Sequence, residues 1–255
     1  MVYMKKLCED VSNAVQEAIS NIFGKIDSGD VLYMGADGTP TTKIDDVAER
    51  AAVRILKEDG RPFNIISEEM GNMTLGEGAE FTIVLDPVDG TYNAIHGIPF
   101  YSFSMAIGRN DLSQIYYGYI RDLVTGDVYL AEKARGAFLN GRQIRVSNNT
   151  KEYCVSTSSQ ISLEKNCKIR LLGSVALELC YVASQKLDAV IDNRNYLRVT
   201  DIAAGKLIVE EAGGMVTDCM NKPLKLPLDV RQKMSIIASN GRIHEELLGK
   251  LKECR

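Results

Sequence analysis

Residues 81–92 read FTIVLDPVDGTY, an apolar run that ends in two aspartates separated by proline and valine. The apolar run predicts a buried β-strand. Pro87 lacks a backbone N–H and has a fixed φ, so we expect the chain to turn at this residue. The turn would direct the Asp86 and Asp89 carboxylates and the Val88 carbonyl to one place. Mg²⁺ and Mn²⁺ prefer such oxygen ligands, and the segment therefore predicts a metal site.

Gly90 and Thr91 follow directly and predict the start of a short helix. The free N–H groups and the dipole at a helix N-terminus favour a bound anion, so a cation and a phosphate would meet at this corner. A purely structural alternative is an Asx turn that caps the helix. That alternative accounts for one of the two aspartates and leaves the other without a role.

Two further acidic segments lie at the ends of predicted elements. Glu68 and Glu69 follow a short apolar strand, and pairing of that strand with the next would bring Glu68 beside Asp86. Asp201 begins a helix rich in small residues, ahead of Gly213-Gly214. Each segment alone has an ordinary interpretation, a solvated loop acid in the first case and a helix N-cap in the second. Together with residues 81–92 they favour one centre built from distant parts of the chain.

The composition narrows the class of protein. The chain has 255 residues, of which 45% are hydrophobic and 25% charged, as in a folded globular protein. The formal net charge of -4, from evenly mixed charges, argues against nucleic acid as a partner. No apolar run is long enough for a membrane span or a leader segment, so we expect a cytoplasmic protein with no membrane partner.

The cysteines and histidines exclude other kinds of catalytic site. The six cysteines are scattered, with no Cys-x-x-Cys pair, so a zinc site is not expected and the thiols are predicted to be reduced. Only His96 and His244 are present, which leaves a histidine-based triad almost without a base. If the protein is an enzyme, its chemistry must depend on carboxylates.

Hydrophobic periodicity divides the chain into two parts. Residues 1–145 predict an α+β half. It contains a helix that ends near Gly24, a loop over 35–45 and a helix over 45–58. It also contains short strands, which favour an antiparallel sheet, at 64–66, 81–85, 102–108, 115–120 and 127–131. Residues 146–255 predict an α/β half, in which strands at 154–156, 169–171, 187–191, 215–217 and 235–238 alternate with helices at 174–184, 201–212 and 242–252.

These motifs together resemble the inositol monophosphatase-like magnesium-dependent phosphatases. The resemblance rests on Asp86-Pro87-Val88-Asp89-Gly90-Thr91, preceded by Glu68-Glu69 and followed by Asp201-Ile202-Ala203-Ala204-Gly205 and Gly213-Gly214, in the family's order over essentially the whole chain. It implies a layered αβαβα sandwich of the sugar phosphatase superfamily. In detail the chain is most similar to the archaeal type, which combines fructose-1,6-bisphosphatase with inositol-1-monophosphatase activity. The expected substrate is therefore a small phosphorylated sugar or cyclitol, and homodimers are usual in the family.

The resemblance also implies a role for each site residue. Two to three Mg²⁺ ions, or Mn²⁺, would be bound: one by Glu68, Asp86 and the Val88 carbonyl, a second by Asp86, Asp89 and Asp201, and a weaker third sharing Glu68. Asp45 and Thr91 are similar to the family's water-positioning pair. The catalytic set is then Asp45, Thr91 and Glu68. The substrate would contact Asp89, Gly90, Thr91, Arg170, Gly173, Ser174, Val175, Arg194 and Asp201.

One departure bears on specificity. Animal-type members carry a glutamate seven positions before the last metal aspartate, where this chain has Arg194. Arg194 and Arg198 could meet the second phosphate of fructose 1,6-bisphosphate, or they could be solvated loop charges. Two alternatives stay open: hydrolysis of 3′-phosphoadenosine 5′-phosphate, for which no aromatic signature of an adenine slot is evident, and a non-catalytic regulatory member of the family.

Overall fold

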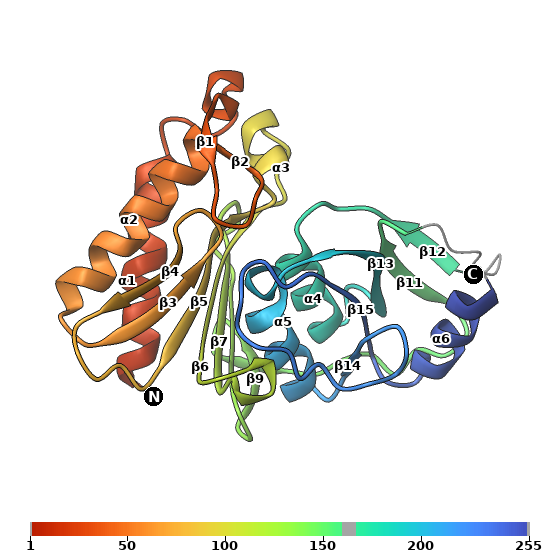
Figure 1. The fold of residues 1–255 in the computed structure, drawn as a ribbon. Helices are drawn as coiled ribbons and strands as arrows, with labels where there is room; N and C mark the ends of the chain where they lie inside the picture. Colours follow the sequence, from red (N-terminus) through yellow and green to blue (C-terminus); the bar gives the residue numbers. More distant parts are fainter. Residues whose placement is uncertain (1, 160–166, 254–255) are drawn as a thin grey trace.

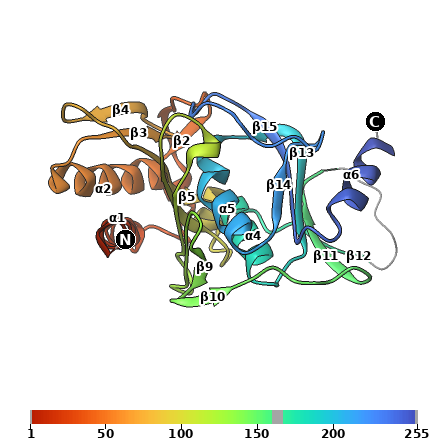
Figure 2. The ribbon, with the colours of Figure 1, turned by 90° about the horizontal axis from the view of Figure 1, so that it is seen from below.

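An eight-stranded sheet and a five-stranded sheet lie face to face with helices between and outside them (Figures 1 and 2). The computed structural model describes residues 2–159 and 167–253. Contacts between elements define five layers, so the layered α/β sandwich expected from the sequence is confirmed. The helical layers are α1 (Val2–Ile19) with α2 (Lys43–Asp59), then α4 (Val175–Ala183) with α5 (Val199–Glu211), then α6 (His244–Glu253).

The eight-stranded sheet has the order β10-β9-β8-β7-β6-β5-β3-β4. Its strands are β3 (Phe63–Ser67), β4 (Gly71–Leu75), β5 (Thr82–Asp89), β6 (Ser102–Gly108), β7 (Tyr117–Asp122), β8 (Val128–Glu132), β9 (Gly136–Leu139) and β10 (Arg142–Ile144). The expectation of antiparallel pairing is wrong for one pair, because β3 and β5 are parallel. The antiparallel strand β4 returns the chain along the outer side of β3, so β5 runs in the same direction as β3.

The five-stranded sheet has the order β12-β11-β13-β15-β14 and mixes parallel with antiparallel pairs. Its strands are β11 (Tyr153–Thr157), β12 (Cys167–Arg170), β13 (Ala189–Leu197), β14 (Met215–Thr217) and β15 (Met234–Ser239). All five were predicted from the sequence, with bounds that differ by at most two residues except that β13 ends at Leu197, six residues later than predicted. The connection from β10 to β11 joins the two sheets. A boundary between residues 145 and 146 stays a prediction.

The loop expected over 35–45 is a turn only over residues 35–39, which join β1 (Val31–Met34) to β2 (Pro40–Thr42) in a hairpin, and α2 begins directly after β2. Apolar periodicity missed this hairpin because β1 exposes all four of its side chains. The remaining short elements are η1 (Ile26–Gly29), α3 (Thr91–His96) and η2 (Leu112–Gln114). The first helix ends at Ile19, earlier than expected, and the residues after it form turns up to Gly24.

Helix α5 packs between the two sheets and contacts strands of both. In its sequence, VTDIAAGKLIVEE, every residue from Val199 to Val209 is buried, as in a helix that packs on both sides and meets solvent only at its C-terminal end. Small residues let it approach the large sheet closely: a Cβ on Gly118 of β7 would lie 2.9 Å from the Ala204 carbonyl oxygen. Cys8, Cys154, Cys167 and Cys180 are free thiols in the described part of the chain, and Cys254 lies outside that part. Within the described residues no helix is both long and apolar enough to cross a bilayer.

The close approach of α5 to β7 gives a test of the fold. We expect Gly118→Ala to lower the free energy of unfolding by about 1 to 3 kcal/mol, because the added methyl group meets backbone atoms that cannot move aside. Gly249→Ala is the matched control, since a Cβ there meets nothing within 4 Å and removes a glycine from helix α6. That variant should gain up to about 1 kcal/mol. Urea unfolding measures both, and equal stability of Gly118→Ala and the parent would contradict the packing.

Candidate active site

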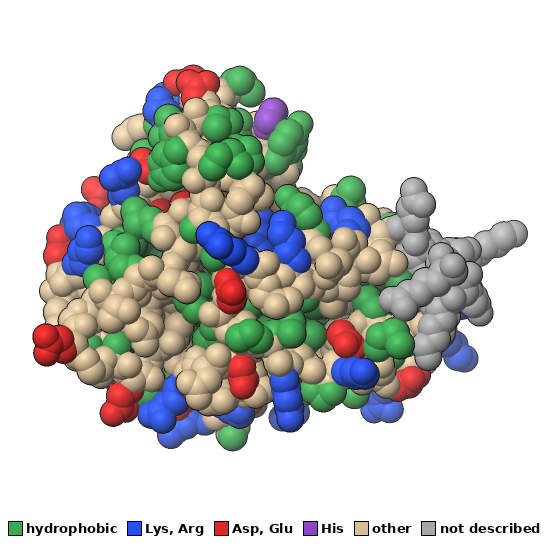
Figure 3. Space-filling view, in the orientation of Figure 1, with side chains coloured by type: hydrophobic (Ala, Val, Ile, Leu, Met, Phe, Trp, Pro, Cys, Tyr) green, Lys and Arg blue, Asp and Glu red, His purple; other side chains and the backbone are tan. Residues whose placement is uncertain are grey.

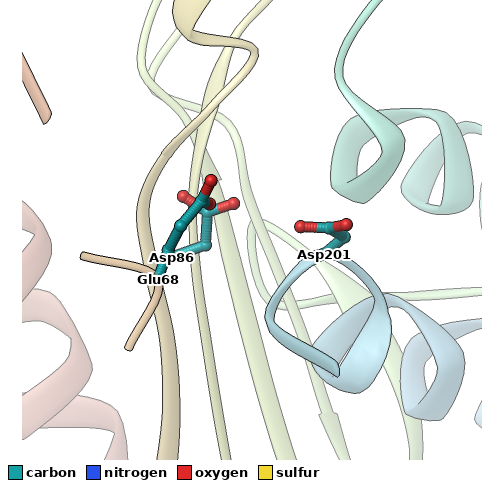
Figure 4. Close-up of side chains that lie close together, drawn as sticks. All are labelled: Glu68, Asp86 and Asp201. Carbon is teal, nitrogen blue, oxygen red and sulfur yellow. The ribbon is translucent and has the colours of Figure 1, made fainter. Parts of the chain in front are cut away.

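Parallel pairing of β3 with β5 brings the first acidic residues together. Ser67 is in register with Leu85, so the next residues, Glu68 just after β3 and Asp86 within β5, lie side by side. Asp201, in the first turn of α5, faces them from the other side (Figure 4). One carboxylate oxygen from each of Glu68, Asp86 and Asp201 lies within 4.8 Å of the others. Asp86 and Asp201 are 115 positions apart in the sequence, and the fold thus brings them into one site.

The expected turn at Pro87 is corrected by the structure. Strand β5 continues through Pro87 to Asp89, and its pairing with β6 shifts register between Asp86 and Asp89. A bulge accommodates a residue that cannot donate to the ladder, so the strand bends without ending. Asp86 Oδ1 accepts a hydrogen bond of 3.0 Å from the Val88 amide within this bend.

Asp89 lines the same cavity but does not belong to the cluster of three carboxylates. Its Oδ2 accepts hydrogen bonds from Ser174 Oγ at 2.5 Å and from the Ala176 amide at 2.7 Å. Ser174 is fully buried, so its side chain holds Asp89 and does not face a substrate as the sequence analysis expected. The first turn of α4 thereby fixes the orientation of Asp89 across the interface between the two sheets.

Gly90 is required by the backbone at the start of α3. Its φ is +96°, and a Cβ there would lie 3.1 Å from the carbonyl oxygens of both Gly173 and Phe100. Asn93, which the sequence analysis missed, donates from Nδ2 to the carbonyls of Phe100 and Leu172 at 2.7 and 2.8 Å. Glycine and asparagine together hold the α3 segment against residues 171–174.

Asp45 and Thr91 lie in contact, as a water-positioning pair requires. Thr91 Oγ1 is 2.9 Å from Asp45 Oδ1 and 3.1 Å from the Val88 carbonyl oxygen. Asp45 occupies the third position of α2, and its second oxygen accepts from the Thr42 hydroxyl at 2.6 Å in a capping box. The cap fixes the Asp45 carboxylate before it meets Thr91. Burial raises the pKa of Asp45, against the lowering effect of the two threonine hydroxyls.

A second layer of carboxylates supports the turn that carries Glu68. Glu49 is buried on α2, and it accepts hydrogen bonds from the Ser67 hydroxyl and from the amides of Glu69 and Met70. Glu69 in turn accepts from the Thr41 hydroxyl of β2. The sequence contains one signal of this arrangement, since Asp45 and Glu49 are four residues apart and so share the face of α2 that packs on the sheet.

Arg198 is a buried cation of the site, so its interpretation as a solvated loop charge is wrong, whereas its contact with a second phosphate stays a prediction. The residue is 6% exposed, and its Nη1 lies 2.8 Å from Asp37 Oδ2 and also contacts Glu68 Oε1. Its backbone amide donates to Asp201 Oδ2 at 2.8 Å. Burial lowers the pKa of Arg198, but Asp201, Glu68 and Asp37 outweigh that effect and raise it overall.

Burial also raises the pKa of the carboxyl groups in the cavity. Repulsion adds to burial at Asp86, whose pKa is raised further by Glu68 and Asp89. The pKa of Asp89 reaches about 7 through burial and the charge of Asp201. The same direction holds for Glu68 and Asp201, although Arg198 opposes it at both. Acids this crowded bind protons or cations, and oxygen donors at this spacing fit a divalent metal ion.

The carboxylates lie at the edge of a cavity of about 600 Å³ between the two sheets. Leu172, Gly173 and Val175 line it, whereas Arg170 is exposed outside its lining and Ser174 is buried behind it. The complete lining is Glu68, Asp86, Val88, Asp89, Gly90, Thr91, Tyr92, Asn93, Ser158, Leu171, Leu172, Gly173, Val175, Glu178, Arg194, Tyr196, Leu197, Arg198 and Asp201. Of the substrate contacts expected from the resemblance, the structure therefore places all except Arg170 and Ser174 at the cavity.

Two exposed tyrosines, Tyr92 and Tyr196, line the cavity. Tyr92 is 68% exposed and stacks on His96 with a centroid distance of 4.0 Å. Tyr196 is 47% exposed, and Arg194 lies over its ring at 5.5 Å. Arg194 also forms an ion pair of 2.5 Å with buried Asp192.

Hydrophobic side chains are conspicuous over the upper part of the molecule, the region of β1, β2 and α3 (Figure 3).

Comparisons with known proteins agree with this geometry. A sequence profile described as the inositol monophosphatase family matches residues 3–255. A fructose-1,6-bisphosphatase/inositol-1-monophosphatase of Methanothermobacter thermautotrophicus is 40% identical, over 98% of this chain and 97% of that protein. The crystal structure of an inositol monophosphatase-fructose 1,6 bisphosphatase superposes with a TM-score of 0.87 at 33% identity, covering 98% of this chain and 99% of that one.

A further relative has a different named activity. The bifunctional NADP phosphatase/NAD kinase of Methanococcus maripaludis is 38% identical over 96% of this chain. The match covers 49% of that protein, so the chain spans about half the length of this relative.

The raised pKa values predict how stability depends on pH when divalent ions are removed. Glu69, whose pKa is raised to about 7 by burial, ionises in the unfolded chain near its ordinary value of 4.5. Because the pKa of Glu69 is higher in the folded chain than in the unfolded chain, the free energy of unfolding falls as the pH rises from about 4.5 to about 7. The pKa of Asp89 is also raised to about 7, so its ionisation lowers the free energy of unfolding in the same direction. We expect the free energy of unfolding in EDTA to fall from about pH 5 to about pH 8.

Glu69→Gln should remove part of that slope, on the order of 1 to 3 kcal/mol across the interval, because the amide cannot ionise. Urea unfolding at a series of pH values measures it. The matched control is Glu77→Gln, at an exposed glutamate, which should leave the slope unchanged. A flat pH profile of the parent protein would contradict the burial of these acids.

Proposed function

The chain belongs to the inositol monophosphatase family and is a phosphoric monoester hydrolase, and from this premise we propose that it hydrolyses fructose 1,6-bisphosphate and inositol 1-phosphate with the help of Mg²⁺. The observation that carries the proposal is the cluster of Glu68, Asp86 and Asp201 in the lining of a cavity large enough for a sugar phosphate. A non-catalytic regulatory role is disfavoured, because Asp45, Thr91 and the cluster are all present and mutually placed.

The donor set fits Mg²⁺ or Mn²⁺, since every candidate ligand is an oxygen and, among the residues that the structure describes, no cysteine or histidine lines the cavity. Glu68, Asp86 and the Val88 carbonyl would hold one ion, and Asp86, Asp89 and Asp201 a second. When bound, such ions offset charge on the phosphoryl oxygens and lower the pKa of water. The fit rests on buried carboxylates whose pKa values are raised by one another, because a cation relieves that repulsion.

The chain's own groups would perform the remaining work on the phosphate and the water. The amides of Gly90 and Thr91, at the N-terminus of α3, would donate to the phosphoryl oxygens. Thr91 donates its hydroxyl proton to Asp45, which leaves the Thr91 oxygen free to accept a hydrogen bond from the attacking water. The raised pKa of Asp45 makes it a stronger acceptor for the proton that the water gives up through Thr91.

Arg194 is the residue that we propose to distinguish the bisphosphate from the monophosphate. Its side chain lines the cavity and keeps 44% of its surface exposed. Asp192 already pairs with it, so a second phosphate would share a guanidinium whose orientation is fixed. Such a preorganised arginine loses little freedom when it binds an anion.

Homodimer formation and a cytoplasmic location stay proposals that rest on the resemblance and the composition.

A second candidate substrate is an adenosine carrying a phosphate on its ribose, as in NADP or 3′-phosphoadenosine 5′-phosphate. Two observations favour it: the Tyr92–His96 stack at the cavity and the named activity of the Methanococcus maripaludis relative. An exposed aromatic face binds a nucleobase by stacking, with a contribution of about 1 to 3 kcal/mol per base. The same carboxylate cluster would serve both substrates, because the reaction at phosphorus is identical.

Phosphate release in the presence of Mg²⁺ tests the proposed reaction. Excess EDTA should abolish turnover, and Asp86→Asn should lower kcat by about 10³-fold or more, equivalent to about 4 kcal/mol, because Asp86 serves both proposed ions. Asp10→Asn, which removes the same charge from an exposed position on α1, is the control and should keep normal turnover. Full activity in EDTA or in Asp86→Asn would contradict the proposal.

Steady-state kinetics on three substrates separates the specificities. Arg194→Ala should raise KM for fructose 1,6-bisphosphate about tenfold, through the loss of a charge-assisted hydrogen bond, and leave inositol 1-phosphate within a few fold. Tyr92→Ala should raise KM for NADP by a similar factor if the base stacks there. Phe23→Ala, at an exposed aromatic outside the cavity lining, is the control for Tyr92. Equal effects of a variant on every substrate would refute its discriminating role.

A further inference from the structure

Glu178 is a buried carboxylate in the lining of the cavity that the proposed reaction does not use. It lies in the first turn of α4 and is 5% exposed. Its Oε1 accepts hydrogen bonds from the amides of Leu172 at 3.0 Å and Gly173 at 3.1 Å. Burial raises the pKa of Glu178, and the two amides oppose that effect. A glutamate on the helix thus holds the backbone of the turn that precedes the helix.

The same turn is held from its other side by α3. Asn93 is also buried, and its Nδ2 donates to the Leu172 carbonyl as well as to the Phe100 carbonyl. Gly173 has a φ of +91°, and a Cβ there would lie 3.0 Å from Asn93 Nδ2. The turn therefore lies between two buried polar side chains from different helices, which leaves it little room to move.

These contacts determine which polar groups the turn can offer to a ligand. Leu172 and Gly173 line the cavity, but the N–H groups of both are bonded to Glu178. Their carbonyl oxygens remain, and such oxygens accept hydrogen bonds from hydroxyl groups. The Glu178 carboxylate also repels an anion placed near the turn, whereas Arg194 in the same lining attracts one. This wall of the cavity therefore suits the hydroxyl groups of a polyol and not a phosphate.

We infer that Glu178 is a positioning residue for the substrate: by holding two amides, it fixes the turn at Leu172 and Gly173 in the shape that receives the hydroxyl groups of a sugar or cyclitol. The inference rests on the proposed function, because it concerns the alcohol half of the same substrates. Loss of Glu178 weakens recognition of the polyol and spares the chemistry at phosphorus.

Steady-state kinetics on inositol 1-phosphate, with inorganic phosphate as a competing inhibitor, tests the inference. Glu178→Leu leaves both amides without an acceptor and should raise KM about tenfold, while kcat stays within about twofold. The inhibition constant of inorganic phosphate should not change, because phosphate has no polyol to contact the turn. Glu178→Gln keeps an oxygen acceptor at the same place and should keep KM within about threefold.

Glu211→Leu is the matched control. Glu211 accepts hydrogen bonds from the amides of Ala134 and Gly136, in the turn between β8 and β9, and it lies outside the described lining of the cavity. This variant should leave KM unchanged. Gly173→Ala is a second variant, which displaces the turn from the Asn93 side and does not depend on Glu178→Leu being folded. It should also raise KM and spare kcat.

An unchanged KM in Glu178→Leu or in Gly173→Ala would overturn the inference, and so would a Glu178→Gln variant as impaired as Glu178→Leu. A parallel rise in the inhibition constant of phosphate would overturn it too, because damage would then extend to the phosphate half of the site. A parent protein that hydrolyses neither inositol 1-phosphate nor fructose 1,6-bisphosphate contradicts the proposed function. Turnover by the parent, with equal losses for substrate and phosphate in the variants, contradicts the inference alone.

Discussion

The crowding of carboxylates between the two sheets is the constraint on which the site depends. Asp86 and its neighbours are held close together away from bulk water, where like charges repel strongly and their pKa values rise. A fold can keep such a group only by positioning each member through other contacts. Here the positioning contacts are the capping box of Asp45, the Ser174 hydroxyl on Asp89 and the amide of Arg198 on Asp201.

The same contacts connect the site to the architecture. Strands β3 and β5 supply Glu68 and Asp86, helix α2 supplies Asp45, and helix α5 supplies Asp201 from between the sheets. Asp45 and Asp201 lie in the first turn of a helix, Glu68 directly follows a strand, and Asp86 lies where β5 shifts its register, and the last accepts a hydrogen bond from the Val88 amide. The layers of the sandwich therefore converge on the cavity, and a shift of α5 relative to β5 would change the distance from Asp201 to Asp86.

Much of the fold and of the candidate site could be predicted from the sequence, because short stretches of sequence contain strong signals for both. The apolar run before Asp86 and Asp89 predicted a strand that carries both carboxylates, and the small residues after Asp201 predicted a helix. Other features have no local signal. The parallel direction of β5 depends on the return strand β4, the burial of Arg198 depends on Asp37 in a hairpin with exposed side chains, and the use of Ser174 depends on docking of α4. Each is fixed by long-range contacts that no short window of sequence contains.

The placement of Asp201 on a helix between two sheets has a consequence for the order of folding. The three carboxylates meet only after the strands of the first sheet have paired and α5 has packed on them, so the centre cannot exist in an early intermediate. A ligand that binds only the completed centre stabilises the native state and not the transition state that precedes it. Divalent ions would then act on the lifetime of the folded chain, by slowing its unfolding, and would leave the rate at which it folds almost unaffected.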